Sequence, residues 1–219
     1  MKRLRISAVA SFTLPLILGI SLSSQAETVK QTAQSYVEMG ETFANHGDLK
    51  RAIGAYTLAL QFAPSSAQAF FHRGQAFDRQ GETAKAIADY SAALDLQPNL
   101  AVAWYNRANL RMKSGDYERA LSDLNKAIGS NPRHARAYNN RGITKVAKGD
   151  FAGAFADFAE AIKLDPHDPQ PLVNRGLLRF RQGLTADADK DFALSVAIDP
   201  SMKGFIEPRI HQTAAARAQ

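Results

Sequence analysis

A period of 34 residues runs through most of this 219-residue chain, and it restricts the fold more than any other feature. Glycines recur at Gly47, Gly81, Gly115, Gly149 and Gly183, and prolines recur at Pro64, Pro98, Pro132, Pro166 and Pro200. Ala52, Ala86, Ala120, Ala154 and Ala188 keep the same step, as do the bulky residues Tyr56, Tyr90, Leu124, Phe158 and Phe192. Such a period is the signature of a repeat architecture, in which each repeat is one small structural unit.

Each repeat is predicted to be a pair of helices. Apolar residues recur at helical spacing on both sides of the periodic glycine, which can adopt the left-handed conformation that ends a helix. In three repeats an aspartate follows the glycine, at Asp48, Asp116 and Asp150, where its side chain can cap the second helix. The periodic proline is expected to stop that second helix near its end.

The side-chain sizes within the unit resemble those of the tetratricopeptide repeat family. Units that begin at Ala33, Ala67, Ala101, Ala135 and Pro169 have a large residue at position 4, namely Tyr36, Phe70, Trp104, Tyr138 and Leu172. Position 8 is small, at Gly40, Gly74, Ala108, Gly142 and Gly176. The family has the same sizes at these positions, with alanine at 20, an aromatic residue at 24 and proline at 32. The resemblance covers residues 33–202.

The expected fold is all-α: a right-handed superhelical solenoid of five helix-turn-helix hairpins. It would occupy residues 27–202, with repeats at 33–66, 67–100, 101–134, 135–168 and 169–202. Stacking is needed because one hairpin cannot bury its apolar stripe alone, and the first helices should line a concave face. Residues 203–219 are expected to form a C-terminal cap or tail, partly disordered, because Pro208 should break a helix there. This weakly capped end offers a route to pairing with a second copy.

Residues 1–26 have the pattern of an export signal. Three basic residues precede an apolar run from Ile6 to Ile20, and Ser24-Gln25-Ala26 supplies small residues around Gln25, as cleavage sites require. We predict cleavage after Ala26 and a periplasmic or secreted protein. The alternative is an uncleaved membrane anchor, although the run is shorter than the roughly 20 residues that span a bilayer and Pro15 interrupts it.

Composition narrows the classes of function further. Removing residues 1–26 lowers the formal net charge from +6 to +3, which is too little to indicate nucleic-acid binding. The chain has no cysteine, which excludes disulfides, thiolate metal sites and thiol nucleophiles. No histidines are paired at helical spacing, and neither a nucleophile-elbow motif nor a phosphate-binding glycine loop is present. Asp165, His167 and Asp168 cluster between two repeats, but turns are routinely rich in aspartate and proline, so no metal or cofactor is expected.

A repeated charge pair stands at positions where the family has other residues. Position 7 is Arg73, Arg107, Arg141 and Arg175 in four units, and position 23 is Asp89, Asp123, Asp157 and Asp191 in the same four. The first unit has Met39 and Ala55 instead, so both charges vanish together. We predict that each arginine forms a shielded ion pair with an aspartate of its own or the adjoining hairpin. This structural role is favoured over ligand contact.

Position 6 faces the predicted groove and is asparagine in three successive units, at Asn106, Asn140 and Asn174. This is similar to the asparagine ladder of the protein O-linked N-acetylglucosamine transferases, where side-chain amides hold an extended peptide through its backbone. The resemblance implies the same role here, since an amide both donates and accepts. Glu38 and His72 depart from the ladder. The alternative, that Asn-Arg-Gly is simply a common variant of this helix, stays open.

Aromatic and basic residues are expected to surround the ladder. They are Phe71, Tyr105 and Asn139 at position 5, Asn109 at 9, Arg79, Lys113 and Arg181 at 13, and Arg136 at 2. A weakly basic groove favours a partner with an acidic segment or a free C-terminal carboxylate. The family's two-carboxylate clamp is not predicted, because no unit has lysine at position 5 or arginine at position 6. The expected function is therefore a non-catalytic adaptor that binds a protein or extended peptide. The alternative is a structural scaffold of an envelope assembly, anchored by an uncleaved N-terminal segment.

Overall fold

The computed structural model describes residues 22–217. The predicted signal segment therefore lies outside the described residues except for its last five, which begin the first helix, α1 (Leu22–Asn45). The predicted cleavage position after Ala26 falls inside this helix. Within the described part of the chain, no helix is both long and apolar enough to cross a membrane.

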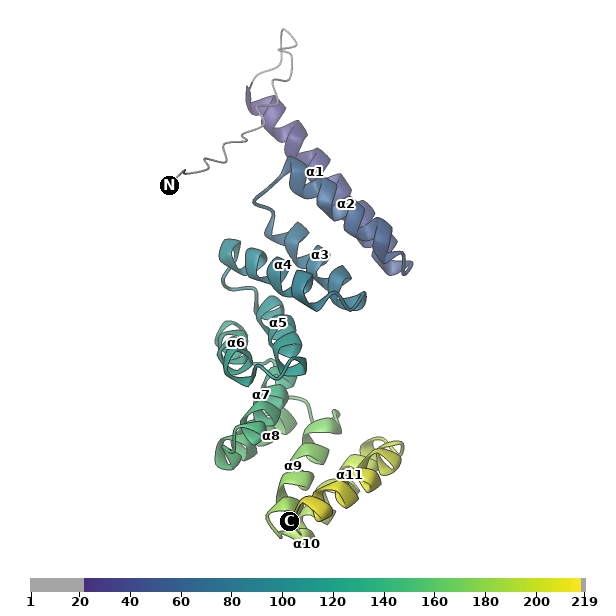
Figure 1. The fold of residues 1–219 in the computed structure, drawn as a ribbon, viewed down its shortest axis with the longest axis vertical. Coiled ribbons are helices and arrows are strands. Elements are labelled where there is room, and N and C mark those ends of the chain that lie inside the picture. The colour runs from purple at the N-terminus through teal and green to yellow at the C-terminus, as the bar shows by residue number, and fades with distance from the viewer. Residues whose placement is uncertain (1–21, 218–219) are drawn as a thin grey trace, which may run out of the picture.

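The described residues form eleven helices and no strand, which confirms the predicted all-α solenoid (Figure 1). After α1 the helices are α2 (Leu49–Phe62), α3 (Ala67–Arg79), α4 (Thr83–Leu96), α5 (Ala101–Lys113), α6 (Tyr117–Ser130), α7 (Ala135–Ala147), α8 (Phe151–Leu164), α9 (Gln170–Arg181), α10 (Thr185–Ile198) and α11 (Met202–Arg217). Consecutive odd and even helices from α1 to α10 pack as five hairpins. The second helix of each hairpin then packs against the first helix of the next.

The turns form as the periodic residues predict. Every periodic glycine has a positive φ, between 75° at Gly115 and 86° at Gly183, so each ends its first helix in the left-handed region. The side chains of Asp48, Asp116 and Asp150 accept hydrogen bonds from backbone N–H groups in the first turn of α2, α6 and α8. The second helices of the five hairpins all end two residues before the periodic proline.

The predicted arginine–aspartate pairs are confirmed, and each lies within one hairpin. Arg107 donates from Nε to Asp123 Oδ2 at 3.0 Å and from Nη2 to Oδ1 at 2.9 Å. The same two-bond geometry joins Arg73 to Asp89, Arg141 to Asp157 and Arg175 to Asp191. All four aspartates are buried. These residues hold the two helices of a hairpin together, so they are not free to contact a ligand.

The C-terminal helix departs from the prediction. The expectation that Pro208 breaks a helix is wrong, since α11 (Met202–Arg217) continues through Pro208. Ile206 is 4% exposed and joins a core cluster with Val173, Ala188 and Phe192. The apolar contacts of the helix therefore outweigh the hydrogen bond that proline cannot donate.

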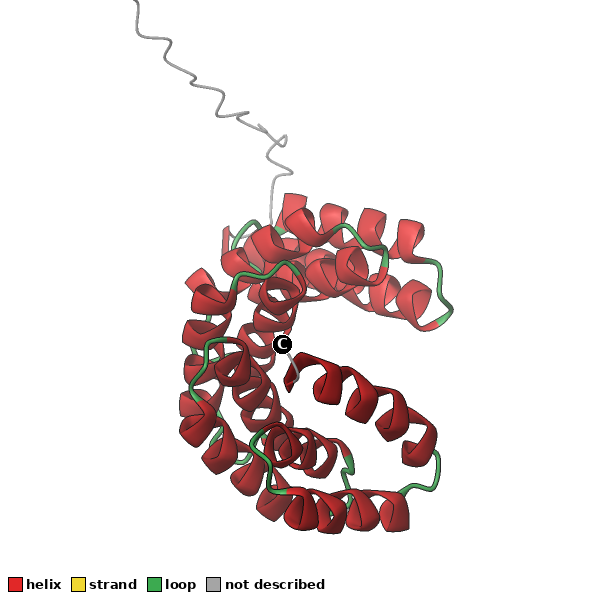
Figure 2. Ribbon diagram, turned by 60° about the horizontal axis from the view of Figure 1, so that its bottom comes forward, coloured by secondary structure: helices red, strands yellow, loops and turns green. Residues whose placement is uncertain are grey.

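α11 does not continue the solenoid as a regular first helix would. It packs more extensively on α9 than on α10, and it lies inside the curve formed by the other helices (Figure 2). Residue size explains the change. Position 3 of the repeat is a small alanine in α3, α5 and α7, at Ala69, Ala103 and Ala137, and a proline in α9, at Pro171, and all four are buried. The corresponding residue of α11 is Phe205, which is too large for that close approach.

Candidate binding cleft on the inner face

Four asparagine side chains form a continuous chain of hydrogen bonds along the inner helices α5, α7 and α9. Asn140 donates from Nδ2 to Asn109 Oδ1 at 2.7 Å and to the Tyr105 hydroxyl at 3.3 Å. Asn139 Nδ2 donates to Asn140 Oδ1 at 3.2 Å, and Asn174 Nδ2 donates to Asn139 Oδ1 at 2.8 Å. The chain thus runs from position 9 of the third hairpin, through positions 6 and 5 of the fourth, to position 6 of the fifth.

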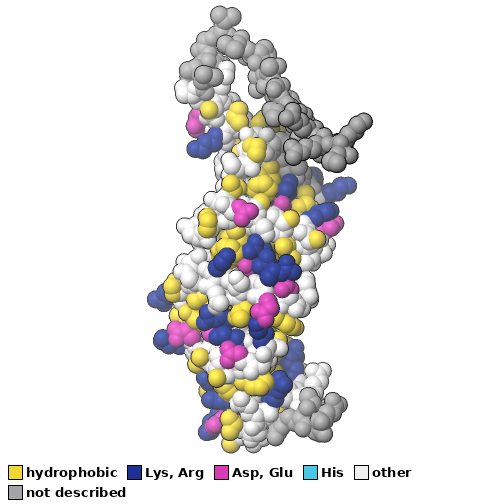
Figure 3. Space-filling view, turned by 60° about the vertical axis from the view of Figure 1, so that its left-hand side comes forward, with side chains coloured by type: hydrophobic (Ala, Val, Ile, Leu, Met, Phe, Trp, Pro, Cys, Tyr) yellow, Lys and Arg dark blue, Asp and Glu magenta, His cyan; other side chains and the backbone are white. Residues whose placement is uncertain are grey.

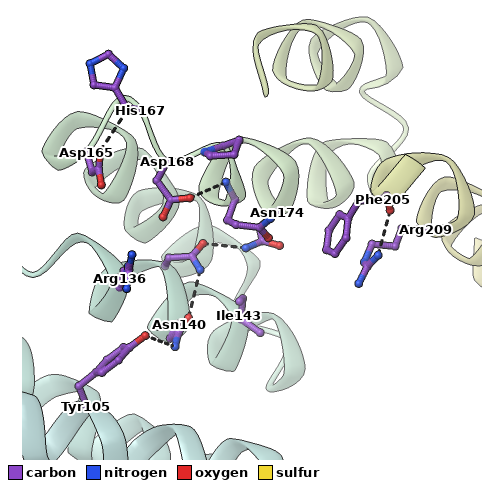
Figure 4. Close-up of a pocket in the computed structure, with 13 residues that line it drawn as sticks. Tyr105, Arg136, Asn140, Ile143, Asp165, His167, Asp168, Asn174, Phe205 and Arg209 are labelled. Atoms are coloured by element: carbon purple, nitrogen blue, oxygen red, sulfur yellow. Dashed lines mark hydrogen bonds between the residues drawn. The ribbon is translucent and has the colours of Figure 1, made fainter. Parts of the chain in front are cut away.

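This amide chain borders a cleft of about 750 Å³ on the inner face (Figure 4). Its lining also includes Tyr105 and Arg136, the turn between α8 and α9, and two residues of α11, Phe205 and Arg209. Five residues singled out from the sequence meet here: Tyr105, Arg136, Asn139, Asn140 and Asn174. Asn109 joins them through its bond to Asn140.

The charges around the cleft are mixed. Arg136 and Arg209 form no ion pair within the described residues, and the Arg209 guanidinium is stacked on Phe205 with 3.3 Å between its carbon and the ring centre. On the other side of the cleft, Asp165 and Asp168 each accept one backbone N–H, as turn caps do. One long side of the molecule shows a similar mixture, with acidic side chains among the lysines and arginines (Figure 3).

His134 supports one wall of the cleft. Its ring packs against Tyr105 in a tilted arrangement with 4.7 Å between ring centres, and its Nδ1 accepts a hydrogen bond from the Ala137 N–H at 3.3 Å. Burial lowers the pKa of His134, and the nearby Arg136 lowers it further. The neutral imidazole that caps α7 is therefore the favoured form.

The remaining predicted site residues lie elsewhere. Phe71 packs among core residues of the second and third hairpins, and Arg181 is stacked on Phe151 at 4.9 Å. Arg79 donates to the Ala44 carbonyl at 2.9 Å, and Lys113 is exposed at the end of α5. None of the four lines the cleft of the amide chain.

Asn106 is separate from the amide chain although it occupies the same position as Asn140 and Asn174. It lies beside the Tyr90 hydroxyl, which is buried without a well-formed hydrogen bond. Burial raises the pKa of Tyr90, and the Asn106 amide opposes this rise. The predicted ladder of three therefore divides into two linked members and one that faces the core aromatic of its hairpin.

A smaller cleft of about 320 Å³ lies at the first two hairpins, where the ladder is interrupted. His72 contacts the Glu41 carboxylate through Nε2 at 3.1 Å and the Gln75 side-chain oxygen through Nδ1 at 3.2 Å. Arg79 also lines this cleft. The inner face thus has an ionic N-terminal part and an amide-rich C-terminal part.

Sequence reasoning missed several residues of the larger cleft. Phe205 and Arg209 were missed because α11 was not expected to fold onto the inner face. Gln170 and Ile143 line the cleft as well, and no pattern in the sequence distinguishes them from other helix residues. The described residues contain no group of three acidic or histidine side chains placed to hold a metal ion.

The chain belongs to the tetratricopeptide repeat family. The family model for this repeat matches residues 37–101, 105–169 and 142–202. A comparison with curated proteins found no match in sequence.

Solved structures with similar folds come from several bacterial proteins. MamA from Desulfovibrio magneticus, residues 41 to the end, superposes with a TM-score of 0.72 at 20% identity, covering 78% of this chain and 96% of that one. YrrB, described as a TPR protein with an unusual peptide-binding site, gives a TM-score of 0.71 at 19% identity over 90% of this chain and 98% of that one. PilF of Pseudomonas aeruginosa gives 0.68 at 21% identity, covering 87% and 90%. At these identities the similarity shows the fold.

Proposed function

We propose that this protein is a non-catalytic adaptor that holds an extended segment of a partner protein along its inner face. Members of this family are in general protein-interaction modules, and YrrB is described as having a peptide-binding site. The observation that carries the proposal is the amide chain from Asn109 to Asn174 beside an open cleft.

The chain of amides has unused hydrogen-bonding capacity at its two ends. A side-chain amide has two N–H donors and an oxygen with two lone pairs. Asn140 uses both donors, whereas Asn174 uses one and Asn109 uses none within the described residues. Asn174 lines the cleft, so its second N–H can donate to a carbonyl group of an extended peptide, and its oxygen can accept from a peptide N–H. Such contacts are independent of the peptide's side chains and hold it through its backbone.

We propose further that a carboxylate of the peptide, from an acidic residue or its C terminus, lies near Arg209 or Arg136. Both guanidiniums line the cleft without an acidic partner. Arg209 is also pre-positioned by its stacking on Phe205. A charge-assisted hydrogen bond from a guanidinium to a carboxylate is among the stronger polar contacts available to a protein.

The test begins with selection of binding peptides from a random phage-displayed library, followed by fluorescence anisotropy on the selected peptide. Asn174→Ala is expected to weaken binding several-fold while the circular dichroism spectrum stays the same. Asn106→Ala is the matched control, because it changes the same repeat position outside the cleft, and it should leave affinity within about twofold. Replacing Asn106, Asn140 and Asn174 together should weaken binding most.

Two outcomes would contradict this assignment. Failure to recover any peptide that binds more tightly than about 1 mM would count against peptide binding as the function. Equal losses from Asn174→Ala and Asn106→Ala would instead leave peptide binding in place and remove the amide chain from it.

We also propose that the protein is exported and works in the periplasm or outside the cell. The basic start, apolar run and small residues before Ala26 support this proposal. N-terminal sequencing of the protein from cells should give Glu27 as the first residue. A start at Met1 would favour the alternative of an anchored scaffold. Self-association through the C-terminal end is a further proposed property, and sedimentation at high concentration that shows only monomer would contradict it.

A further inference from the structure

One wall of the larger cleft comes from α11, the last helix. Its residues Phe205 and Arg209 line the cleft and lie on the side opposite Tyr105 (Figure 4). The other lining residues belong to α5, α7, α9 and the turn between α8 and α9. The cleft is therefore complete only while α11 lies against α9.

A single buried side chain anchors α11 in this place. Among the side chains of α11 that the structure describes, Ile206 alone is buried, and it packs in one cluster with Val173 and Phe192. The neighbouring α9, a regular first helix, has five buried residues. A hydrogen bond of 3.3 Å from Gln170 Nε2 to Met202 Sδ joins the first residue of α11 to α9. The docking of the helix thus depends largely on one residue.

The space around α11 is also incompletely filled. An apolar groove of about 560 Å³ lies between α10 and α11, and a smaller pocket of about 210 Å³ is lined by Thr213 together with residues of α7, α8 and α9. Pro208, in the middle of the helix, cannot donate a backbone hydrogen bond. Few buried contacts are typical of segments that open locally while the rest of a protein stays folded.

We propose that α11 is a movable wall of the cleft, and that its docking and the binding of a peptide favour each other. Ile206 is then a positioning residue, because it does not line the cleft but places Phe205 and Arg209, which do. A peptide that contacts Arg209 binds the docked state more tightly, so it shifts α11 toward that state. By reciprocity, a change that undocks α11 weakens peptide binding. This inference rests on the proposed function, since it concerns regulation of the same cleft.

One introduced thiol can report the opening of α11, because the chain has no cysteine. Val173 is fully buried in the cluster that contains Ile206, and Val37 is the matched position of the first hairpin, 2% exposed in a cluster of the first two hairpins. Val173→Cys is expected to react with a thiol reagent about tenfold faster than Val37→Cys. A saturating amount of a peptide selected from the library should slow the reaction of Val173→Cys several-fold and leave that of Val37→Cys unchanged.

Affinity for the same peptide supplies the reciprocal measurement. Ile206→Ala should weaken binding about fivefold or more, because a smaller fraction of the protein has α11 docked. Glu207→Ala changes the next, exposed residue of α11 and should leave affinity within about twofold. Val146 and Thr213 line the small pocket beside α11 but not the cleft. A short thiol crosslinker between Val146→Cys and Thr213→Cys should hold α11 in place and restore the affinity of the Ile206→Ala protein.

Several outcomes would overturn the coupling. Equal reaction rates of the two single-cysteine variants would show that α11 does not open by itself. A bound peptide that leaves the reaction of Val173→Cys unchanged, wild-type affinity in Ile206→Ala, or a loss of affinity that the crosslink does not restore would separate α11 docking from peptide binding, which would itself stand. Failure to recover any binding peptide contradicts the proposed function instead, and it removes the coupling as well.

Discussion

Side-chain volumes at positions 8 and 24 of the repeat are matched pair by pair. A methyl group added to Gly142 would lie 2.6 Å from the Phe158 ring, and one added to Gly176 would lie 2.6 Å from the Phe192 ring. The third hairpin differs at both positions, because Ala108 faces the smaller Leu124, and both are fully buried. Glycine is thus required where position 24 is aromatic, and alanine is accepted where it is leucine.

Gly142→Ala is accordingly expected to destabilise the protein. Overpacking costs about 1–3 kcal/mol, and the higher helix propensity of alanine returns at most about 1 kcal/mol. Thermal unfolding followed by circular dichroism should show a lower midpoint for the variant. The double change Gly142→Ala with Phe158→Leu copies the pair in the third hairpin and should regain most of the loss. A double variant no more stable than Gly142→Ala would show that the two positions are not coupled.

An exposed helical glycine provides the opposite result. Gly54 lies within α2, and an added methyl group would meet no atom within 4 Å. Gly54→Ala should therefore stabilise the protein by about 0.5–1 kcal/mol, through helix propensity alone. Gly142→Ala and Gly54→Ala should therefore change the free energy of unfolding in opposite directions, which separates the effect of side-chain packing from that of helix propensity.

His134 makes stability depend on pH in a defined direction. Its pKa in the folded protein lies below the ordinary value of 6.5, because burial disfavours the charged ring. The neutral ring therefore contributes stability above pH 6.5, and this contribution is lost as the pH falls below 6.5 toward the folded-state pKa. His134→Asn keeps a capping side chain without a titrating ring. Between about pH 7.5 and about pH 5, the melting temperature of the wild type should fall further than that of His134→Asn. Equal falls would contradict this role.

Between elements, three of the four arginines at position 7 join three helices. Two nitrogens of each bond to the aspartate of its own hairpin, and the third reaches the preceding hairpin, whereas Arg175 bonds to Asp191 alone. Arg73 Nη1 donates to Thr57, Arg107 Nη1 to Ser91 and Arg141 Nη1 to Asn125, at 3.2, 2.7 and 2.8 Å. Among the described residues no hairpin precedes the first, where Met39 and Ala55 stand in place of the pair. The charge pair therefore belongs to the contact between repeats as well as to each repeat.

Asp123→Ala should destabilise the protein by about 3–5 kcal/mol, because it leaves Arg107 and Arg111 with no acidic partner in a largely buried site. Arg107→Met combined with Asp123→Ala installs the pair of the first hairpin and should cost less than the single change. Chemical denaturation measures both. If the single variant is at least as stable as the double, the bonds to Asp123 do not hold the hairpin as inferred.

At the level of the whole molecule, the sequence predicts those features that depend on residues close together in the chain. Glycine turns, aspartate caps and proline stops depend on residues within one repeat, so the hairpins and their boundaries could be predicted. The amide chain could be predicted only in part, because Asn139 and Asn140 are neighbours in sequence while Asn109 and Asn174 come from other hairpins. The placing of α11 depends on how its side chains pack against α9 and α10. No local pattern reveals this, and the cleft residues that α11 supplies were missed with it.

A solenoid whose repeats contact only their neighbours should respond locally to a weakened end. Ile206 anchors α11 to Val173 and Phe192, and Ile206→Ala removes this contact at a cost of about 2–5 kcal/mol. Because α3 to α6 share no extensive contact with α11, their opening should be little affected, whereas α9 and α10 should open more often. Native-state hydrogen exchange resolves the two regions. Faster exchange confined to α9, α10 and α11 is the expected result. A uniform increase along all the helices would mean that the five hairpins unfold as one cooperative unit, and that α11 stabilises the whole solenoid rather than its last repeat.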